Sequence, residues 1–374
     1  MRIALLAHTD APWTPLYAAH FAAAGHIVTI LSFCPDSLPN AAQLPATCTV
    51  TFVGDLPYNP AGNKTVFLRK IPRVRALLRQ FRPDVVFAPY LLSNGLCAAL
   101  AWRGPLVVTA VGSDVLQQAG TLRLPPLVRR ALVTVVARRA RWMVAVSEEL
   151  AQACVQLGAK PGQVKVFPVG IDVQAFQPGP KSQPGQPLAV VCVRKHAPVY
   201  ENHVLLQAIA LLRQQHAQGR PAVPLTCTFA GSGPLLASFR QQVKALSLQD
   251  CVTVLGHVDH AEVASLLAAA DVSVSCTSSD GTSAALLEGM ASGALPVVTD
   301  ITANQGWVVP GVNGLQFPVG DVVALAAALR QASQDFALRD RALHDNPPRV
   351  AAQADIAVNM GKVLEMLEDA WRRG

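Results

Sequence analysis

The sequence contains no uncharged apolar run of about 18 residues, the length that a membrane-spanning helix requires. The N-terminal stretch MRIALLAHTDAPW also differs from a signal peptide, because its apolar part is short and no small-residue cleavage site follows it. These two absences predict a cytoplasmic protein without a transmembrane segment.

The eight cysteines include no CxxC pair, and most of them lie within apolar runs. We interpret them as small buried hydrophobic side chains in a reducing compartment. His257 and His260 form an HxxH pattern, but no third ligand accompanies it and the segment is typical of a turn into a helix. We therefore expect no metal site.

Aromatic residues are scarce, at 6%, whereas hydrophobic residues of all types make up 51% of the 374 positions. A chain with few aromatics and much Ala, Val and Leu is typical of helices packed on a sheet. The length favours two or three domains, although single α/β barrels of this size exist.

Acidic residues are few in the first half of the chain. Residues 1–180 carry 17 Lys and Arg against 8 Asp and Glu, whereas residues 181–374 carry 14 against 16. This imbalance predicts an anionic partner for the first half. No aromatic residues alternate with the charge in the way that nucleic-acid binding requires, so nucleic acid is not expected.

Two basic clusters account for much of this charge. The first contains no acid and comprises Arg123, Arg129, Arg130, Arg138, Arg139 and Arg141. The second comprises Arg69, Lys70, Arg73, Arg75, Arg79 and Arg82. We interpret the first cluster as a contact with an anionic membrane surface or an anionic acceptor; an ordinary solvated helix face is the alternative.

Short apolar runs recur along the first half, each separated from the next by a helix-length segment. They predict strands at 2–7, 26–33, 83–89, 105–112, 142–147 and 164–170. Alternation of buried strands with helices predicts a doubly wound parallel sheet.

The segment 177–187, QPGPKSQPGQP, lacks periodicity and predicts a linker. The alternation then restarts, with strands expected at 188–194, 225–231, 252–256, 272–277 and 295–300. We predict domains at 1–180 and 181–348, followed by a helix at 349–374 that begins after the Pro-Pro pair and packs back on the first domain. Two Rossmann-like domains in tandem would leave a ligand cleft at the carboxyl ends of their strands.

The stretch DGTSAALLEGMASGALPVV, residues 280–298, places a glutamate in an apolar helix. Thr282 or Ser283 is a suitable N-cap for a helix that starts near Ala284. The exposed N–H groups at such a helix start bind anions, and small residues there let a ligand approach closely. A buried Glu288 needs partners, and two vicinal ribose hydroxyls would satisfy its oxygens, as would a nearby arginine or backbone group.

This stretch resembles the signature of the retaining glycosyltransferases of the GT-B fold, specifically family 4 (glycosyl transferases group 1). The resemblance continues at FPVGIDVQAFQP (167–178), FAGSGPLL (229–236), VTVLGHVDHAEVASLLAAADVSVSCTSS (252–279) and PGVNGLQFPVGD (310–321). It covers most of residues 164–330 in the family's order, whereas the first half matches in layout and at TAVGSD (109–114).

The resemblance implies a role for individual residues. Glu288 would hold the nucleotide ribose, Asp280 the transferred sugar and Arg194 the donor diphosphate. Asp280 replaces the family's usual Glu and is one methylene shorter. The backbone of Gly281, Thr282, Ser283, Ala284 and Ala285, and the glycine turn at Gly231 and Gly233, would bind the donor.

The second half departs from the family pattern at one position. The family has a lysine about five residues after the arginine, where this chain has Val199 and Tyr200. Lys195 could replace it as a diphosphate ligand, although successive residues of a strand point to opposite faces.

The first half departs from the pattern at two positions. HTDAPWTP (8–15) stands where the family often has a Gly-Gly turn, and Val111 stands where it has a histidine. His8 and Asp114 are the candidate acceptor-binding residues that remain, with a strand-end polar residue and a turn acid as the alternatives.

We thus expect a metal-independent retaining transferase without a cofactor, which moves a hexosyl or N-acetylhexosaminyl group from a UDP- or GDP-sugar to a lipid-linked or anionic envelope glycan. The other major transferase fold binds its metal ion through an Asp-x-Asp motif at the end of a strand. No such motif follows a predicted strand here. The alternatives are a non-catalytic sugar-nucleotide-binding protein and a GT-B sugar-nucleotide epimerase. A NAD dehydrogenase is not expected, because no G-x-G-x-x-G follows the first strand.

Overall fold

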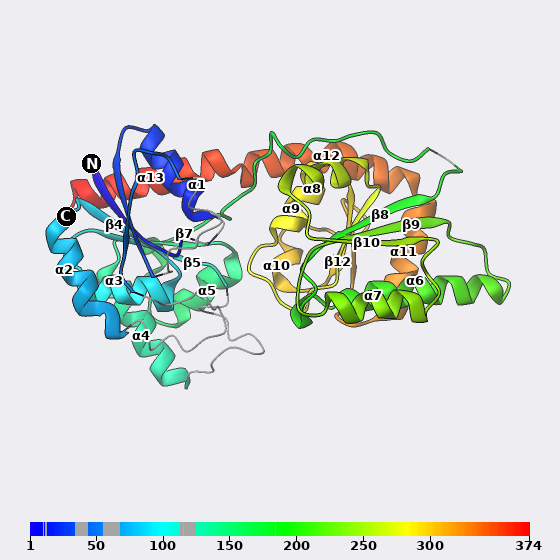
Figure 1. Cartoon of the computed structure of the whole chain (residues 1–374), viewed down its shortest axis with the longest axis horizontal. Coiled ribbons are helices and arrows are strands. Elements are labelled where there is room, and N and C mark those ends of the chain that lie inside the picture. The colour runs from blue at the N-terminus through cyan, green and yellow to red at the C-terminus, as the bar shows by residue number, and fades with distance from the viewer. Residues whose placement is uncertain are drawn as a thin grey trace. The chain divides into compact units, whose positions relative to one another are not determined.

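The computed structural model describes residues 1–9, 11, 13–33, 44–54, 68–112, 115, 125–183 and 185–374. The chain forms two compact units (Figure 1). The first unit comprises Met1–Val169 together with Ile356–Gly374, and the second unit comprises Gly170–Asp355.

The described part of the first unit contains a seven-stranded sheet of order β3-β2-β1-β4-β5-β6-β7, in which all strands pair in parallel. Its strands are β1 (Arg2–Leu6), β2 (Ile27–Ser32), β3 (Thr49–Phe52), β4 (Val85–Pro89), β5 (Leu106–Ala110), β6 (Trp142–Ala145) and β7 (Val164–Val166). Its helices are α1 (Trp13–Ala23), α2 (Ile71–Phe81), α3 (Leu96–Ala101), α4 (Pro126–Arg139), α5 (Glu148–Gln156) and α13 (Ile356–Arg372).

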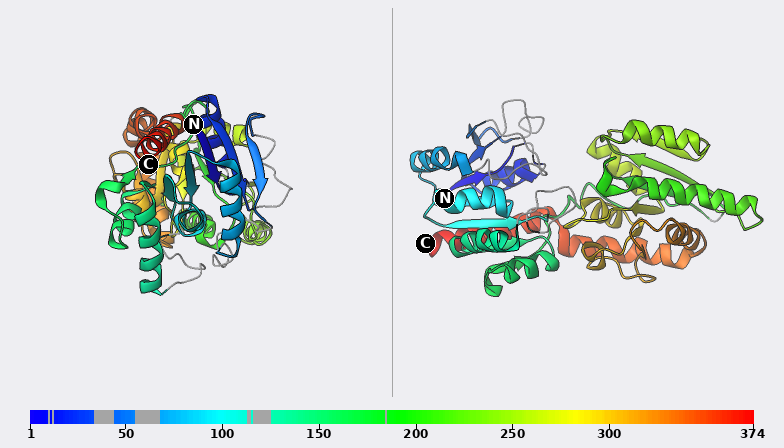
Figure 2. Two further views of the ribbon diagram at one scale, coloured as in Figure 1. Left: turned by 90° about the vertical axis from the view of Figure 1, so that its left-hand side faces the viewer. Right: turned by 90° about the horizontal axis from the view of Figure 1, so that it is seen from below.

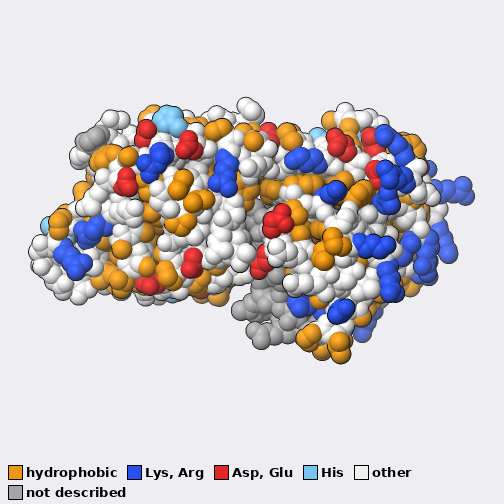
Figure 3. Space-filling model, turned by 180° about the vertical axis from the view of Figure 1, so that it is seen from behind, with side chains coloured by type: hydrophobic (Ala, Val, Ile, Leu, Met, Phe, Trp, Pro, Cys, Tyr) orange, Lys and Arg blue, Asp and Glu red, His pale blue; other side chains and the backbone are white. Residues whose placement is uncertain are grey.

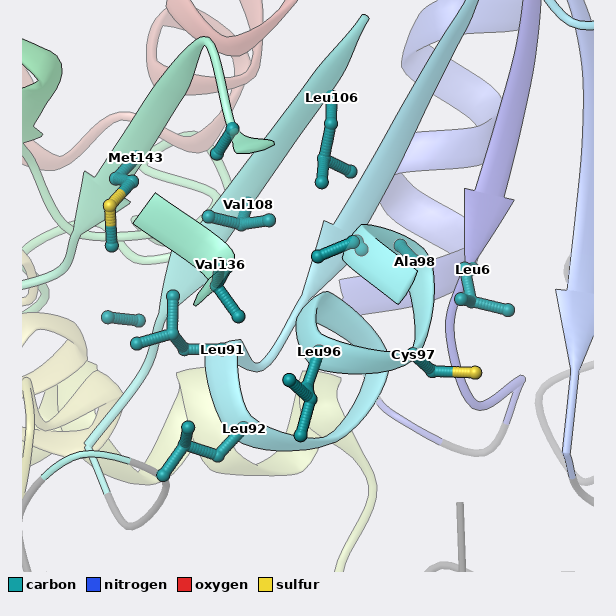
Figure 4. Packing of buried hydrophobic residues seen from close by; sticks show 14 of the residues in the cluster. Leu6, Leu91, Leu92, Leu96, Cys97, Ala98, Leu106, Val108, Val136 and Met143 are labelled. Carbon is teal, nitrogen blue, oxygen red and sulfur yellow. The ribbon is translucent and has the colours of Figure 1, made fainter. Parts of the chain in front are cut away.

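Alternate residues of β1 supply the two core layers of this unit. Leu6 belongs to the layer of α2, α3 and α4, and Figure 4 shows it beside Cys97 in the cluster that also contains Leu96, Val108 and Val136. Ile3 faces the opposite layer, which contains Val363 of α13. A parallel strand covered on both faces must be apolar at nearly every position, which is why these strands are recognisable as continuous runs.

The second unit repeats this plan with a six-stranded parallel sheet of order β10-β9-β8-β11-β12-β13. Its strands are β8 (Leu188–Val193), β9 (Leu225–Ala230), β10 (Val252–Gly256), β11 (Val272–Ser275), β12 (Leu295–Thr299) and β13 (Leu315–Phe317). Its helices are α6 (Asn202–Ala217), α7 (Leu236–Ala245), α8 (His260–Ala269), α9 (Ala284–Ala291), α10 (Thr302–Gln305), α11 (Val322–Gln334) and α12 (Phe336–Ala354). Figure 2 shows helices on both faces of each sheet.

The two doubly wound parallel sheets confirm the predicted fold class, and each predicted strand is present. Two strands, β3 and β13, were not predicted. Both are short, β3 alternates Thr with Val and Phe, and β13 contains a polar Gln316. With only four and three residues, and polar ones among them, they do not give the apolar run by which the other strands were recognised.

The boundary between the units lies at Val169/Gly170, whereas the sequence analysis placed it at 180/181. The residues between these positions pack on the second unit: Phe176 is 1% exposed. Lys181 also anchors this segment, since its Nζ donates to the carbonyls of Ala268, Ala270 and Ser292 at 2.8, 2.8 and 2.9 Å. These carbonyls lie at the C-terminal ends of α8 and α9, where a cation is favourable.

The expected helix break at the Pro-Pro pair is wrong. Pro347 and Pro348 lie inside α12, and the chain turns instead at Asp355, whose ψ of 122° is extended. Tertiary contacts hold the helix through the prolines: Asn346 is fully buried and exchanges hydrogen bonds with Asn313, at 2.9 and 3.0 Å. The following helix, α13, packs on the sheet of the first unit as predicted.

Candidate functional site

The candidate site lies where the strand order of the second sheet reverses. Its central pair is β8 and β11, and ligands of open α/β sheets bind beyond the carboxyl ends of such a pair. Arg194 directly follows β8, Ser275 is the last residue of β11, and the turn at Asp280 leads from β11 into α9. Side chains from two strands and one helix therefore meet at this end of the sheet.

The guanidinium of Arg194 is held by three side chains. Its Nη2 donates to Asp280 Oδ2 and to Ser283 Oγ, both at 2.6 Å, and its Nε donates to Ser275 Oγ at 3.1 Å. Tyr200 covers it, with the guanidinium carbon 5.1 Å from the centre of the ring. A guanidinium with several donors fixed in one plane suits recognition of a diphosphate.

Ser283 is the N-cap of α9, and Thr282 is not. The Ser283 hydroxyl accepts from the Leu286 N–H at 3.1 Å, whereas the Thr282 hydroxyl donates to the Gly281 carbonyl. Ala284 is exposed, and it opens the helix as predicted. The first turn of a helix has N–H groups without intrahelical acceptors, so the N-terminus of α9 places partial positive charge beside Arg194.

Both carboxylate oxygens of Asp280 accept hydrogen bonds at this turn. Oδ2 accepts from Arg194, and Oδ1 accepts from the backbone N–H of Gly281 at 2.9 Å. The Gly281 N–H is consequently already bonded, which leaves the groups nearer the helix start as the donors for an anion.

Glu288 lies on the second turn of α9, and its side chain is 14% exposed. Burial raises the pKa of its carboxyl from 4.5 to about 7, and the positive charge of Arg194 opposes that rise. The partner of the carboxylate among the described side chains is His260, whose Nε2 lies 3.9 Å from Oε1. Such a carboxylate has capacity for further hydrogen-bond donors, as the ribose interpretation requires.

His260 was not predicted as a site residue. It is the first residue of α8, and its ring meets Phe176 edge-on at 4.9 Å between ring centres. Asp259, which precedes it, caps α8 by accepting from the Glu262 N–H at 2.8 Å. The HxxH pattern drew attention to His260 as a metal ligand, whereas its contact with Glu288 depends on the tertiary packing of α8 on α9.

The glycine turn at 231–233 packs against the backbone that follows β8. A Cβ on Gly231 would lie 2.2 Å from the Arg194 carbonyl oxygen, and a Cβ on Gly233 would lie 2.3 Å from the His196 carbonyl oxygen. No side chain fits at either position. The turn thus supports the backbone of Arg194, and the structure brings both glycines to the predicted site.

Asn202 also supports this backbone and was not predicted as a site residue. Its Nδ2 lies 3.2 Å from the Lys195 carbonyl oxygen and 3.4 Å from that of Arg194. Lys195 itself is exposed, and its side chain forms no hydrogen bond or ion pair with the described residues. Tyr200, one of the two residues that stand where the family pattern has its lysine, covers the Arg194 guanidinium with its ring.

The structure describes only one of the two candidate acceptor-binding residues of the first unit. His8 follows β1 and is only 4% exposed, with its ring 5.8 Å from that of Phe33. Asp114 lies outside the described residues.

Three of the six arginines of the first basic cluster are bonded within the protein. Arg129 and Arg139 donate to the carbonyls of Val115 and Trp102, and Arg141 pairs with Asp369 at 3.5 Å. Arg130 and Arg138 are exposed and form no hydrogen bond or ion pair with the described residues, and Arg123 lies outside them. Figure 3 shows the Lys and Arg side chains gathered over the first unit, at the right of the view.

The described residues contain neither a cluster of candidate metal ligands nor a membrane-spanning helix. No group of three or more His, Cys, Asp or Glu side chains in these ranges is arranged to hold a metal ion. None of the helices that they form combines the length and the apolar character needed to cross a membrane.

Comparisons with known proteins identify the family of both halves of the chain. Residues 17–175 match the family described as Glycosyltransferase Family 4, and residues 187–335 match Glycosyl transferases group 1. The putative colanic acid biosynthesis glycosyltransferase WcaL of Salmonella typhimurium is 30% identical over 204 residues, which cover 53% of this chain and 48% of the relative. The D-inositol 3-phosphate glycosyltransferase of Streptosporangium roseum is 28% identical over 278 residues, or 70% and 63% of the two chains.

The chain thus spans less than two thirds of the length of these two relatives. Among solved structures, HepE of Anabaena in complex with UDP superposes with a TM-score of 0.76 at 18% identity, covering 99% of this chain and 100% of that one. At 18% identity, this similarity shows that the two proteins share a fold. The two family matches correspond to the two sheets and together extend over most of the chain, which belongs to the GT-B glycosyltransferases of family 4.

Proposed function

We propose that the protein is a retaining glycosyltransferase that moves a hexosyl or N-acetylhexosaminyl group from a UDP- or GDP-sugar to an acceptor hydroxyl. The observation that carries this proposal is the Arg194 guanidinium, fixed by Asp280, Ser283 and Ser275 at the N-terminus of α9. Glu288 lies one turn further along the same helix. This spacing suits a donor whose diphosphate contacts Arg194 and whose ribose contacts Glu288.

The chemistry follows from these charges. As the bond between the sugar and the diphosphate breaks, negative charge develops on the leaving diphosphate, and Arg194 and the α9 N-terminus stabilise it without a metal ion. Asp280, next to the transferred sugar, already accepts from Arg194 and Gly281. A carboxylate engaged in this way is a weak covalent nucleophile, which favours attack of the acceptor on the same face as the departing diphosphate.

In this proposal the acceptor binds to the first unit, and His8 and Asp114 are its candidate contacts. We propose a lipid-linked or anionic envelope glycan, because the relative WcaL is named for colanic acid biosynthesis. A peripheral contact with an anionic membrane surface would involve Arg130 and Arg138 of α4, together with Leu127, which is 81% exposed.

A non-catalytic sugar-nucleotide-binding protein remains the second candidate function. The observation that favours it is the pair Val199 and Tyr200, which stands where the family pattern has a lysine: the Tyr200 ring contacts the Arg194 guanidinium but adds no positive charge there. Such a protein would bind the donor without releasing its nucleoside diphosphate.

Calorimetric titration and thermal shift with UDP-, GDP- and ADP-sugars test the proposal, with Glu288→Ala beside the wild type. We expect one nucleotide to bind the wild type and to bind Glu288→Ala much more weakly. Glu262→Ala, which removes an exposed glutamate from α8, is the matched control and should bind like the wild type. Failure of every nucleotide to bind would refute the donor site. Binding of the donor without release of nucleoside diphosphate, even when extracts that contain candidate acceptors are added, would favour the non-catalytic alternative. A changed stereocentre in the bound sugar would favour an epimerase.

A further inference from the structure

A small pocket in the first unit is lined by three arginines. It has a volume of about 330 Å³ and is formed by Arg75, Leu78, Arg79, Ala101, Trp102 and Arg103. The first three of these residues belong to α2, and the others belong to the end of α3 and the turn after it. The two helices are neighbours in the fold (Figure 1). We call it the arginine pocket.

The arginine pocket lies near the amino-terminal ends of the parallel strands, whereas the candidate acceptor residue His8 lies at their carboxyl ends. Helix α2 ends at Phe81, shortly before β4 begins at Val85, and Trp102 and Arg103 shortly precede the start of β5 at Leu106. Because all strands of this sheet are parallel, the pocket is at the end of the sheet where the strands begin. His8 follows the last residue of β1 and is therefore at the opposite end of the strands. The pocket is distinct from any site at the carboxyl ends of the strands.

The positive charge of the pocket is not compensated within the described protein. None of Arg75, Arg79 and Arg103 forms an ion pair with a described carboxylate, and no acidic residue lines the pocket. Arg75 and Arg79 stand four residues apart on α2, where like charges repel each other. The nearest acid in sequence, Asp84, accepts instead from the Arg2 backbone N–H at 2.6 Å. A bound anion would relieve this repulsion.

The walls of the pocket are held in place by hydrogen bonds. Arg75 Nη2 donates to the Leu100 carbonyl at 2.9 Å, and the Trp102 indole N–H donates to the Pro105 carbonyl at 3.0 Å. A Cβ on Gly104 would lie 2.5 Å from the indole ring, so the turn fits closely against Trp102. Arg75 thereby also satisfies a carbonyl at the end of α3, whereas Arg79 and Arg103 form no hydrogen bond with the described residues. These two retain all their donors for a ligand.

We propose that the arginine pocket binds a phosphate group, with Arg79 and Arg103 as its principal ligands. Guanidinium groups match phosphate oxygens in pairs, and the remaining donors of Arg75 extend the same positive surface. Leu78 and the ring of Trp102 give the pocket an apolar side, which suits the organic part of a phosphate ester. The phosphate belongs either to a soluble ester or to a lipid headgroup.

Calorimetric titration with inorganic pyrophosphate tests the proposal. The double variant Arg79→Gln/Arg103→Gln should bind about tenfold more weakly or worse, because it loses at least one charge-assisted hydrogen bond. Arg73→Gln, an exposed arginine of α2 outside the pocket, is the matched control and should bind like the wild type. Thermal unfolding of the three proteins should coincide, since all the substituted side chains are exposed.

Pyrophosphate can also bind at Arg194, so the same titration is repeated with Arg194→Ala. Binding that is retained in Arg194→Ala, and lost when Arg79→Gln/Arg103→Gln is added to Arg194→Ala, is assigned to the arginine pocket, whether or not the proposed function holds. Binding that persists in this triple variant, or that Arg194→Ala alone abolishes, overturns the proposal.

Co-sedimentation with phosphatidylcholine vesicles, with and without phosphatidylglycerol, separates the two sources of phosphate. Loss of phosphatidylglycerol-dependent sedimentation in the double variant, beside retention in Arg73→Gln, assigns the pocket to a lipid headgroup. Unchanged sedimentation together with weakened pyrophosphate binding assigns it to a soluble ester.

Discussion

The Nη2 atom of Arg194 lies 2.6 Å from Oδ2 of Asp280, and this ion pair joins the end of β8 to the turn that follows β11. The two side chains are 10% and 21% exposed, so the pair is screened little by water. It orients the guanidinium toward the start of α9 before any ligand is present. A second ion pair of the same length, Arg213 with Asp250, lies on the surface of the same unit and provides a natural control.

Substitution of Arg194 by lysine should lower turnover of the donor by roughly 10²- to 10³-fold, the range observed when one group that stabilises developing charge is removed. A lysine keeps the charge but cannot bond Asp280, Ser283 and Ser275 together from one plane. Release of nucleoside diphosphate under steady-state conditions measures the effect. Arg213→Lys should leave turnover unchanged. A rate for Arg194→Lys close to that of the wild type would show that charge alone, and not the fixed fork, is what the reaction requires.

Substitution of Glu288 by glutamine should stabilise the protein above neutral pH. The pKa of this carboxyl is raised from 4.5 to about 7 in the folded state, so the native protein holds a proton that the unfolded chain has lost between these values. The stabilising effect of that proton is present below pH 4.5 and is lost as the pH rises through 7. The variant has no such loss and should gain roughly 1–3 kcal/mol at pH 8 but little at pH 4.5.

Urea denaturation of the wild type and Glu288→Gln at several pH values measures this difference. Glu262→Gln, which changes an exposed glutamate, should show no such dependence on pH. A constant difference between Glu288→Gln and the wild type would mean that the carboxyl titrates normally and that its burial is incomplete in solution.

Substitution of Tyr200 by leucine should weaken donor binding about 3- to 10-fold, because the stacking of the ring on the Arg194 guanidinium is lost. Tyr200→Phe keeps the ring and should resemble the wild type. We expect the effect mainly in KM, since the ring orients Arg194 in the ground state as well as during the reaction. Equal losses in the phenylalanine and leucine variants would assign the role to the hydroxyl instead.

Substitution of Lys181 by methionine should destabilise the protein by roughly 1–3 kcal/mol at pH 7, because carbonyls at the ends of α8 and α9 lose their donor. Burial lowers the pKa of Lys181 from 10.5 to about 8, so the native state binds fewer protons than the unfolded chain between these values. The wild type therefore gains stability from this group as the pH rises from 8 to 10.5, and the variant does not.

The difference between wild type and Lys181→Met should accordingly widen over that range in denaturant unfolding experiments. Lys244→Met, at an exposed position of α7, is the control and should give a small difference that does not change with pH. A narrowing difference would contradict the lowered pKa.

The central strands and their order of alternation with helices were predictable from the sequence, because a parallel strand covered on both faces must be apolar throughout. The same reasoning failed for β3 and β13, which have only four and three residues and include polar ones. It also failed at Pro347 and Pro348, where local propensity favours a break but buried contacts of Asn346 hold the helix together. Local signals decide an element only where tertiary contacts do not oppose them.

For the candidate site, the sequence alone determined which residues bear the charge and where a helix begins: the family motifs contain Arg194, Asp280 and Glu288, and capping chemistry placed the helix start at Ala284. Only the tertiary structure decided which side chains meet. Tyr200 covers Arg194, His260 approaches Glu288, and three arginines of the first basic cluster are bonded within their own unit. Contacts between residues distant in sequence depend on how helices pack on the sheet, and no local pattern of residues encodes that distance.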